Sequence, residues 1–130
     1  MSLAELPVLV AEDVNSTRFQ IRDVLKECGF RKIALATSGE EAKAILQTEP
    51  ISLILCDWYM SPTDGFEVLK FVRSHEKLKH IAFIMVTGES TKERVIDAIQ
   101  NGVDDYLVKP LTTLQVQSKV FQILTKRKMI

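Results

Sequence analysis

Short apolar runs alternate along this chain with longer segments in which apolar residues recur at helical spacing. Each run is followed at once by polar or turn-forming residues, which is typical of buried strands in a parallel sheet. The expected strands cover residues 8–11, 33–36, 51–57, 81–86 and 105–108. Strands that alternate with helices predict an α/β fold, in which a doubly wound parallel sheet of five strands is covered on both faces by five helices.

Capping residues indicate where several of these helices begin and end. Three pairs have the spacing of a capping box: Ser38 with Glu41, Ser90 with Glu93, and Thr112 with Gln115. The first helix is expected over residues 16–28 and should end at Gly29 in a left-handed cap. Its expected inward-facing residues are Phe19, Val24, Leu25 and Cys28.

The length and composition of the chain limit the number of domains, the cellular compartment and the partners that we expect. The 130 residues, of which 46% are apolar, suit a single domain over residues 1–130, with residues from about 6 to 126 structured. There is neither a bilayer-spanning apolar segment nor a signal-peptide pattern, so we expect a cytoplasmic protein with Cys28 and Cys56 reduced. A formal net charge of zero argues against direct binding of nucleic acid or an acidic membrane.

Polar side chains stand at the carboxyl ends of four of the five expected strands. They are Glu12 and Asp13 after the first strand, Asp57 at the end of the third, Thr87 after the fourth and Lys109 after the fifth. The carboxyl ends of parallel strands share one edge of the sheet, and open α/β sheets bind their ligands at that edge. The sequence therefore predicts one site that contains all five side chains.

The three acids in this set predict a metal site. Like charges held close together raise each other's pKa and destabilise the fold unless a cation lies between them. Carboxylates, a backbone carbonyl and water are the ligands that suit Mg²⁺. No histidine lies near these strand ends, which argues against zinc. Any one of these acids alone would be interpreted as a helix cap or a solvated loop residue.

The remaining polar residues of the set suit an added anion. Lys109, placed beside three acids, is expected to act as a counter-ion rather than as a surface lysine. Pro110 favours a cis peptide bond that would aim Lys109 across the sheet edge. Thr87, followed by the small Gly88, could offer its hydroxyl to a phosphoryl oxygen. Tyr106 is expected to be half-buried with its hydroxyl in water.

Taken in this order, the residues resemble the receiver domains of two-component response regulators over essentially the whole chain. The matching pieces are residues 10–13, Arg18, 25–30, 57–60, 64–65, 86–88, 102–106 and 109–110. The resemblance implies a flavodoxin-like three-layer sandwich with the strand order 2-1-3-4-5 found in chemotaxis receivers.

The resemblance also implies a phosphoacceptor and a metal. Asp57 would take a phosphoryl group from a histidine kinase, from a phosphotransfer protein or from a small donor such as acetyl phosphate. Mg²⁺ would be held by Asp13, Asp57, the backbone carbonyl of Tyr59 and, through water, Glu12. The metal would neutralise charge on the transferring oxygens, because positioning and electrostatics do most of the work in phosphoryl transfer.

A switch is implied as well. Thr87 and Lys109 would bind the new phosphoryl oxygens, and Thr87 would move inward and leave a space for Tyr106 to fill. The surface formed by the fourth helix, fifth strand and fifth helix would then change and bind a downstream protein. The sequence is compatible with two kinds of protein. One is a stand-alone regulator of the chemotaxis type, and the other is a receiver cut from a longer chain with a DNA-binding or enzymatic output domain.

Two positions depart from the commonest receiver pattern. Ser61 stands between Met60 and Pro62, where proline usually follows the methionine directly, and Tyr59 stands where small or polar residues are frequent. We hypothesise that the Tyr59 ring shields the acyl phosphate from water.

Two other classes of function fit the sequence less well. A metal-dependent phosphatase that uses Asp57 for turnover would need a second acid at the position of Tyr59. A flavin mononucleotide-binding protein would need a loop rich in glycine and hydroxyl groups after the first strand, where Glu12 and Asp13 would repel a phosphate.

Overall fold

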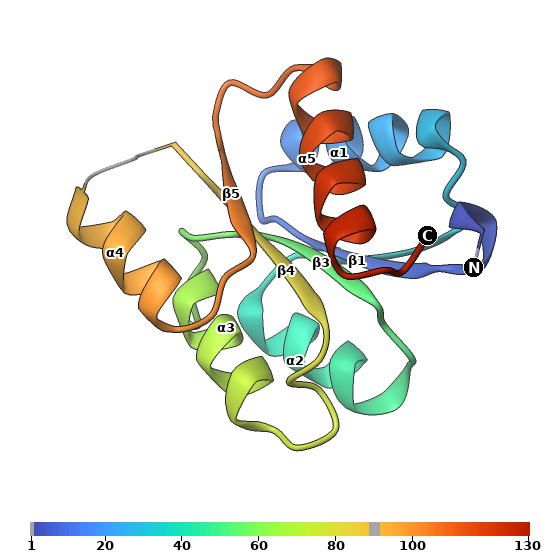
Figure 1. The fold of residues 1–130 in the computed structure, drawn as a ribbon. Coiled ribbons are helices and arrows are strands. Elements are labelled where there is room, and N and C mark those ends of the chain that lie inside the picture. Colours follow the sequence, from blue (N-terminus) through green and yellow to red (C-terminus); the bar gives the residue numbers. More distant parts are fainter. Residues whose placement is uncertain (1, 89–91) are drawn as a thin grey trace.

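A parallel sheet of five strands forms the middle layer of the computed structural model, which describes residues 2–88 and 92–130 (Figure 1). The strands are β1 (Pro7–Ala11), β2 (Lys32–Ala36), β3 (Leu53–Asp57), β4 (Ala82–Thr87) and β5 (Asp105–Val108). Their order is β2-β1-β3-β4-β5, and every neighbouring pair is parallel, which confirms the expected fold class. β3 is the central strand, and all five of its residues are buried.

Within the described residues, five α-helices cover the two faces of this sheet. They are α1 (Asn15–Cys28), α2 (Gly39–Thr48), α3 (Gly65–Ser74), α4 (Lys92–Gln100) and α5 (Thr113–Lys126). α1 and α5 lie on one face, and α2, α3 and α4 lie on the other (Figure 1). No helix in the described ranges is long and apolar enough to cross a bilayer.

Alternation along each strand divides the core into two layers, because successive side chains of a strand point to opposite faces. Val8 and Val10 of β1 pack in the cluster that contains the apolar side chains of α1 and α5. Leu9, between them, packs in the cluster of α2, α3 and α4. A doubly wound sheet with apolar side chains on both faces therefore has only its edges and the ends of its strands free for polar groups.

The capping predictions are confirmed in part. Thr112 and Gln115 form the complete box at the start of α5. Ser38 accepts a hydrogen bond from the Glu41 amide at the start of α2, but the Glu41 carboxylate accepts from the backbone N–H of Thr37 instead of that of Ser38. Ser90, of the third expected box, lies outside the described residues.

The inward face of α1 differs from the prediction at Phe19. Val24 and Leu25 are buried as expected, but the Phe19 side chain is 39% exposed. Its ring lies beside the guanidinium groups of Arg18 and Arg22, at 4.9 and 4.7 Å from its centroid. Arg18, directly before Phe19, is buried, and successive residues lie about 100° apart around a helix. Phe19 therefore faces solvent, while Arg18 reaches toward the end of β1.

A cluster of charged side chains joins several elements at the opposite end of the sheet, where the strands begin. The Asp104 carboxylate lies 3.1 Å from Nη2 of Arg73 on α3 and 2.8 Å from Nε of Arg127 at the end of α5. It also accepts a hydrogen bond of 2.7 Å from the Phe83 amide of β4. Arg73 Nε donates to the Gly102 carbonyl at 2.8 Å. One carboxylate thus joins α3, β4, the α4–β5 turn and α5.

Candidate functional site

The five polar residues predicted from the strand ends lie at one edge of the sheet. Glu12 and Asp13 directly follow β1, Asp57 ends β3, Thr87 ends β4 and Lys109 directly follows β5. Carboxylate oxygens of Glu12, Asp13 and Asp57 all lie within 4.8 Å of one another. The structure therefore brings together the acids of two neighbouring strands, as the sequence predicts.

Asp57 is held by tight backbone packing at the end of the central strand. It pairs with Val86 of β4, and the next amide, that of Trp58, donates to the Val86 carbonyl at 2.8 Å. On the other side, the Gly65 amide donates to the Trp58 carbonyl at 2.8 Å, and a Cβ added at Gly65 would overlap the Asp57 carbonyl oxygen. The start of α3 can approach this closely only because residue 65 has no side chain. Asp57 itself is 4% exposed.

Glu12 is fully buried, and its neighbours fix its position. Its amide donates to the Ala36 carbonyl at 2.9 Å, and its Oε2 accepts from the Val14 amide at 3.1 Å. Arg18 Nη1 donates to the Glu12 carbonyl at 2.9 Å. Burial raises the pKa of Glu12, and the bonds from Lys109 and Val14 offset only part of that rise. Arg18, one of the matching positions of the receiver pattern, therefore holds the end of β1.

Lys109 bridges the two buried acids. Its Nζ lies 2.8 Å from Glu12 Oε1 and 3.4 Å from Asp57 Oδ2. Burial by itself would lower the pKa of Lys109, but the two carboxylates outweigh burial and the pKa is raised, so the side chain is an ammonium at neutral pH. The Lys109–Pro110 peptide bond is cis, as expected, and so is Ser61–Pro62.

Asp13 is the exposed member of the acid group. Burial and the adjacent Glu12 raise its pKa. Asp13 lines an open cavity of about 290 Å³ whose other walls come from the segment after β3: Tyr59, Met60, Ser61 and Asp64. Asp13 is therefore reached from solvent on the side of the β3–α3 loop.

The donor set at this edge fits Mg²⁺. Three carboxylates close to one another are the hard oxygen ligands that Mg²⁺ takes, and the open cavity leaves room for the waters that it keeps. Glu12 Oε1 is buried, yet it accepts no hydrogen bond of good geometry from the described residues, and its close charged neighbour is Lys109. Such an oxygen has lone pairs left for a metal-bound water.

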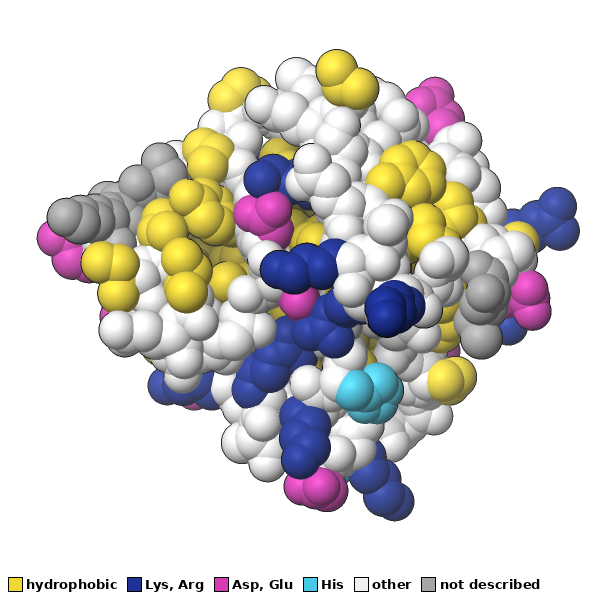
Figure 2. All heavy atoms as spheres, viewed as in Figure 1, with side chains coloured by type: hydrophobic (Ala, Val, Ile, Leu, Met, Phe, Trp, Pro, Cys, Tyr) yellow, Lys and Arg dark blue, Asp and Glu magenta, His cyan; other side chains and the backbone are white. Residues whose placement is uncertain are grey.

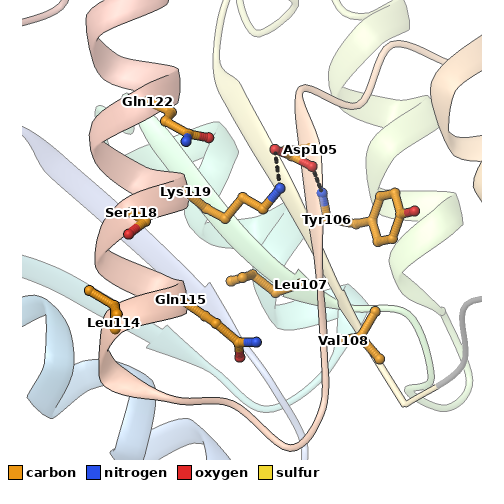
Figure 3. A pocket seen from close by; sticks show the side chains of 9 residues that line it. All are labelled: Asp105, Tyr106, Leu107, Val108, Leu114, Gln115, Ser118, Lys119 and Gln122. Atoms are coloured by element: carbon orange, nitrogen blue, oxygen red, sulfur yellow. Dashed lines mark hydrogen bonds and ion pairs between the residues drawn. The ribbon is translucent and has the colours of Figure 1, made fainter.

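Thr87 and Tyr106 line a second, much smaller cavity. It has a volume of about 10 Å³, and Trp58, Met85, Arg94, Val95 and Ala98 complete its walls. Thr87 is 4% exposed and Tyr106 is half-buried, as expected. Figure 3 shows the Tyr106 ring on the side of β5 away from α5. The residues predicted to form the switch are therefore neighbours, and the movement itself stays a prediction.

The segment after Asp57 contains one contact that sequence analysis missed. The Tyr59 side chain is 42% exposed, and its amide donates a long hydrogen bond of 3.4 Å to Asp57 Oδ1. The guanidinium of Arg94, on α4, lies 4.9 Å from the centroid of the Tyr59 ring. No motif marks Arg94 in the sequence, because the contact depends on how α4 lies against the β3–α3 loop.

Fold and site define the class to which this protein belongs. The chain is a member of the response regulator receiver domain family, whose model matches residues 8–121. Receiver domains of this family are signalling switches of two-component systems.

Among its relatives, the chemotaxis protein CheY of Pseudomonas aeruginosa is 32% identical over 121 residues, which cover 93% of this chain and 98% of that protein. CheY-3 of Vibrio cholerae is 31% identical and is covered to 93%, again over 93% of this chain. The solved structure of CheY4 from Vibrio cholerae superposes with a TM-score of 0.86 at 28% identity, covering 92% of this chain and 98% of that one.

Proposed function

We propose that Asp57 is the phosphoacceptor of this receiver domain. Its carboxylate oxygen attacks the phosphorus of a phosphohistidine on a histidine kinase or a phosphotransfer protein. A P–O bond forms, the P–N bond breaks, and its electron pair leaves on the imidazole nitrogen, so that Asp57 becomes an acyl phosphate. The observation that carries this proposal is the convergence of Glu12, Asp13 and Lys109 on a carboxylate at the end of the central strand.

The other site residues act by position and charge. Asp13, Asp57 and the Tyr59 carbonyl are proposed to hold Mg²⁺, with Glu12 acting through a bound water. The metal, when bound, would neutralise negative charge on the transferring oxygens. Lys109 Nζ, now 3.4 Å from Asp57 Oδ2, and the Thr87 hydroxyl are proposed to bind the oxygens of the new phosphoryl group.

A partner surface is proposed on α4, β5 and α5. Figure 2 shows apolar side chains gathered over α4 on this face. Exposed apolar residues on these elements are Ile96, Ile99, Val108, Leu114 and Phe121. Between β5 and α5 lies a groove of about 510 Å³, crossed by the ion pair of 2.9 Å between Lys119 and Asp105 (Figure 3). Exposed apolar side chains around a groove that contains an ion pair suit a transient protein partner.

The chemotaxis type of regulator is the form that we favour. The curated chemotaxis relatives align over nearly their full lengths, and the zero net charge of the chain argues against a nucleic-acid partner for this domain. A reducing cytoplasm suits the free thiols of Cys28 and Cys56. A receiver that is joined to an output domain is the alternative, and the length of the gene would distinguish the two.

Intact-mass measurement after incubation with acetyl phosphate and Mg²⁺ tests the proposed chemistry. We expect one phosphoryl adduct on the wild type, none on Asp57→Asn, and none on the wild type in EDTA. Asp97→Asn, which removes an exposed acid of α4, is the matched control and should carry the adduct. An equal adduct on Asp57→Asn would refute the assignment.

Trp58 provides a second test that needs no phosphoryl donor. It is the single tryptophan of the chain, it is buried, and it directly follows Asp57. Its fluorescence should change as Mg²⁺ is added, and a flat titration in the wild type would contradict a metal site beside it.

A further inference from the structure

The Arg94 side chain of α4 lies against both aromatic residues that follow Asp57. Its guanidinium carbon lies 5.0 Å from the Trp58 ring and 4.9 Å from the centroid of the Tyr59 ring. Both distances are within the range in which a cation is attracted to the face of an aromatic ring. The Trp58 ring in turn stacks on Phe66 of α3, with ring centroids 5.2 Å apart and an interplanar angle of 2°. Arg94 therefore ties α4 to the segment that carries Asp57.

The two aromatic residues face different parts of the site. Tyr59 lines the open cavity through which solvent reaches Asp13, and its amide contacts Asp57 Oδ1. Trp58 lines the small cavity that it shares with Thr87 and Arg94. One guanidinium thus contacts a side chain at the entrance of the acid pocket and a side chain next to the proposed switch.

Few of the described side chains of α4 are buried against the rest of the fold. Among its residues 93–100, only Ala98 is buried, and Ile96 and Ile99 are exposed. A helix with so little buried apolar surface belongs to the less stable part of a fold. A cation shared by two rings is therefore one contact by which α4 is held to the β3–α3 loop.

We propose that Arg94 is a positioning residue that holds the Tyr59 ring over the acid pocket and so slows the loss of the phosphoryl group from Asp57. This inference rests on the proposed function of Asp57. In the hydrolysis, a water oxygen forms a bond to phosphorus, the bond from phosphorus to the Asp57 oxygen breaks, and inorganic phosphate leaves. Asp57 is 4% exposed, and the proposed route of that water is the cavity that Tyr59 lines together with Asp13.

The position of Arg94 on α4 adds a consequence. A partner that draws α4 away from the loop would also draw the guanidinium from Tyr59 and open the pocket to water. The lifetime of the phosphoryl group would then depend on what is bound to α4, by a route separate from the movement of Thr87 and Tyr106.

The experiment measures the rate at which the phosphoryl adduct disappears after the donor has been removed, by intact mass in the presence of Mg²⁺. The free energy of a partly buried cation–π contact corresponds to an acceleration of about three- to tenfold in Arg94→Ala. Arg94→Lys keeps a cation and should restore part of the lifetime. Tyr59→Asn should be as fast as Arg94→Ala, and the double variant should be no faster than either single variant.

Lys43→Ala is the matched control, because it removes another cation–π contact, that of Lys43 on Phe71 at 5.3 Å, between α2 and α3. It should decay at the wild-type rate. In the unphosphorylated protein, quenching of Trp58 fluorescence by acrylamide should increase in Arg94→Ala and not in Lys43→Ala. A general loss of stability in Arg94→Ala would explain neither the equal decay rates of the single and double variants nor the longer phosphoryl lifetime in Arg94→Lys.

The results that would overturn the inference differ from those that would overturn the proposed function. If the wild type and Arg94→Ala both carry the adduct and lose it at the same rate, the role of Arg94 is refuted and that of Asp57 stands. Rates that multiply in the double variant would also refute it, because the two residues would then act independently. If the wild type takes no adduct from any donor, the proposed function fails and this inference fails with it.

Discussion

Replacement of Asp13 by asparagine should stabilise the metal-free protein. Asp13 adds a negative charge to a group that already contains Glu12 and Asp57, whose ion-pair partner among the described residues is Lys109. The asparagine side chain has nearly the same size as the aspartate that it replaces, and it removes the repulsion. We therefore expect Asp13→Asn to unfold at a higher urea concentration than the wild type in EDTA at pH 7.

The structure sets the size of this effect. The carboxylate oxygens lie within 4.8 Å of one another. Two like charges at such a distance repel by about 1 kcal/mol in bulk water and by about 3.5 kcal/mol at an effective dielectric constant of about 20. Asp13 is exposed and Lys109 offsets part of the repulsion, so the expected gain in the free energy of unfolding is about 1–2 kcal/mol.

The dependence of the free energy of unfolding on Mg²⁺ and on pH provides two further tests of the Asp13→Asn prediction. The wild type should gain about 2.7 kcal/mol when Mg²⁺ is present at a hundred times its dissociation constant. Asp13→Asn, which lacks a proposed ligand, should gain much less. The pKa of Asp13 is raised by burial and by Glu12. The destabilisation by the Asp13 charge is therefore complete at pH values above this raised pKa. It is absent below the pKa of about 4 in the unfolded state, where the two proteins should be equally stable.

Urea unfolding of wild type, Asp13→Asn and Asp23→Asn, each in EDTA and in Mg²⁺, provides the measurement. Asp23 is the matched control, because it lies on the exposed side of α1 and pairs with Arg22 at 2.9 Å. Asp23→Asn should leave the stability unchanged or slightly lower in both buffers. If Asp13→Asn is less stable than the wild type in EDTA, the reasoning from charge repulsion is wrong.

Three other predictions concern the backbone, the distant charged cluster and the lysine. Gly65→Ala should lower the free energy of unfolding by about 1–3 kcal/mol through overlap with the end of β3. Gly88→Ala, where an added Cβ would contact none of the described residues, should change it by less than about 0.5 kcal/mol in the same urea assay. Arg127→Met should lower it by about 1–3 kcal/mol, because the Asp104 carboxylate loses a charged donor. The pKa of Lys109 is raised in the fold, so its contribution should be present below about pH 10 and lost as the pH rises through the folded value. Thermal melts should then show a steeper alkaline loss in the wild type than in Lys109→Met.

The acid site could be predicted because each of its residues has a local signal. Asp57 ends an apolar run, and a run of that kind marks a strand whatever surrounds it. Parallel strands then bring their carboxyl ends together without any further information about the sequence. Two levels of structure, strand and sheet, are enough to place Glu12, Asp13 and Lys109 near Asp57.

The errors and omissions concern contacts between elements that are distant in the chain. Phe19 has the character of a core residue, but Arg18 bonds the Glu12 carbonyl, and this fixes the rotation of α1 with Phe19 outside. The contact of Arg94 with Tyr59 depends on where α4 lies, and the role of Asp104 depends on two arginines that are 31 and 23 residues away. Patterns within a single helix or strand contain no information about such distances.

The Asp104 cluster limits how α4 can move. Arg73 bonds the Gly102 carbonyl just after α4 ends, and Asp104 fixes the following residues to α3 and α5. While this cluster stays intact, any movement of α4 would be a rotation about its carboxyl-terminal end. Its nine residues span about 13 Å, so a rotation of about 10° displaces the amino-terminal turn by about 2 Å and the last turn hardly at all. The part of α4 that would move furthest is the amino-terminal turn near Arg94, which contacts the two rings that follow Asp57.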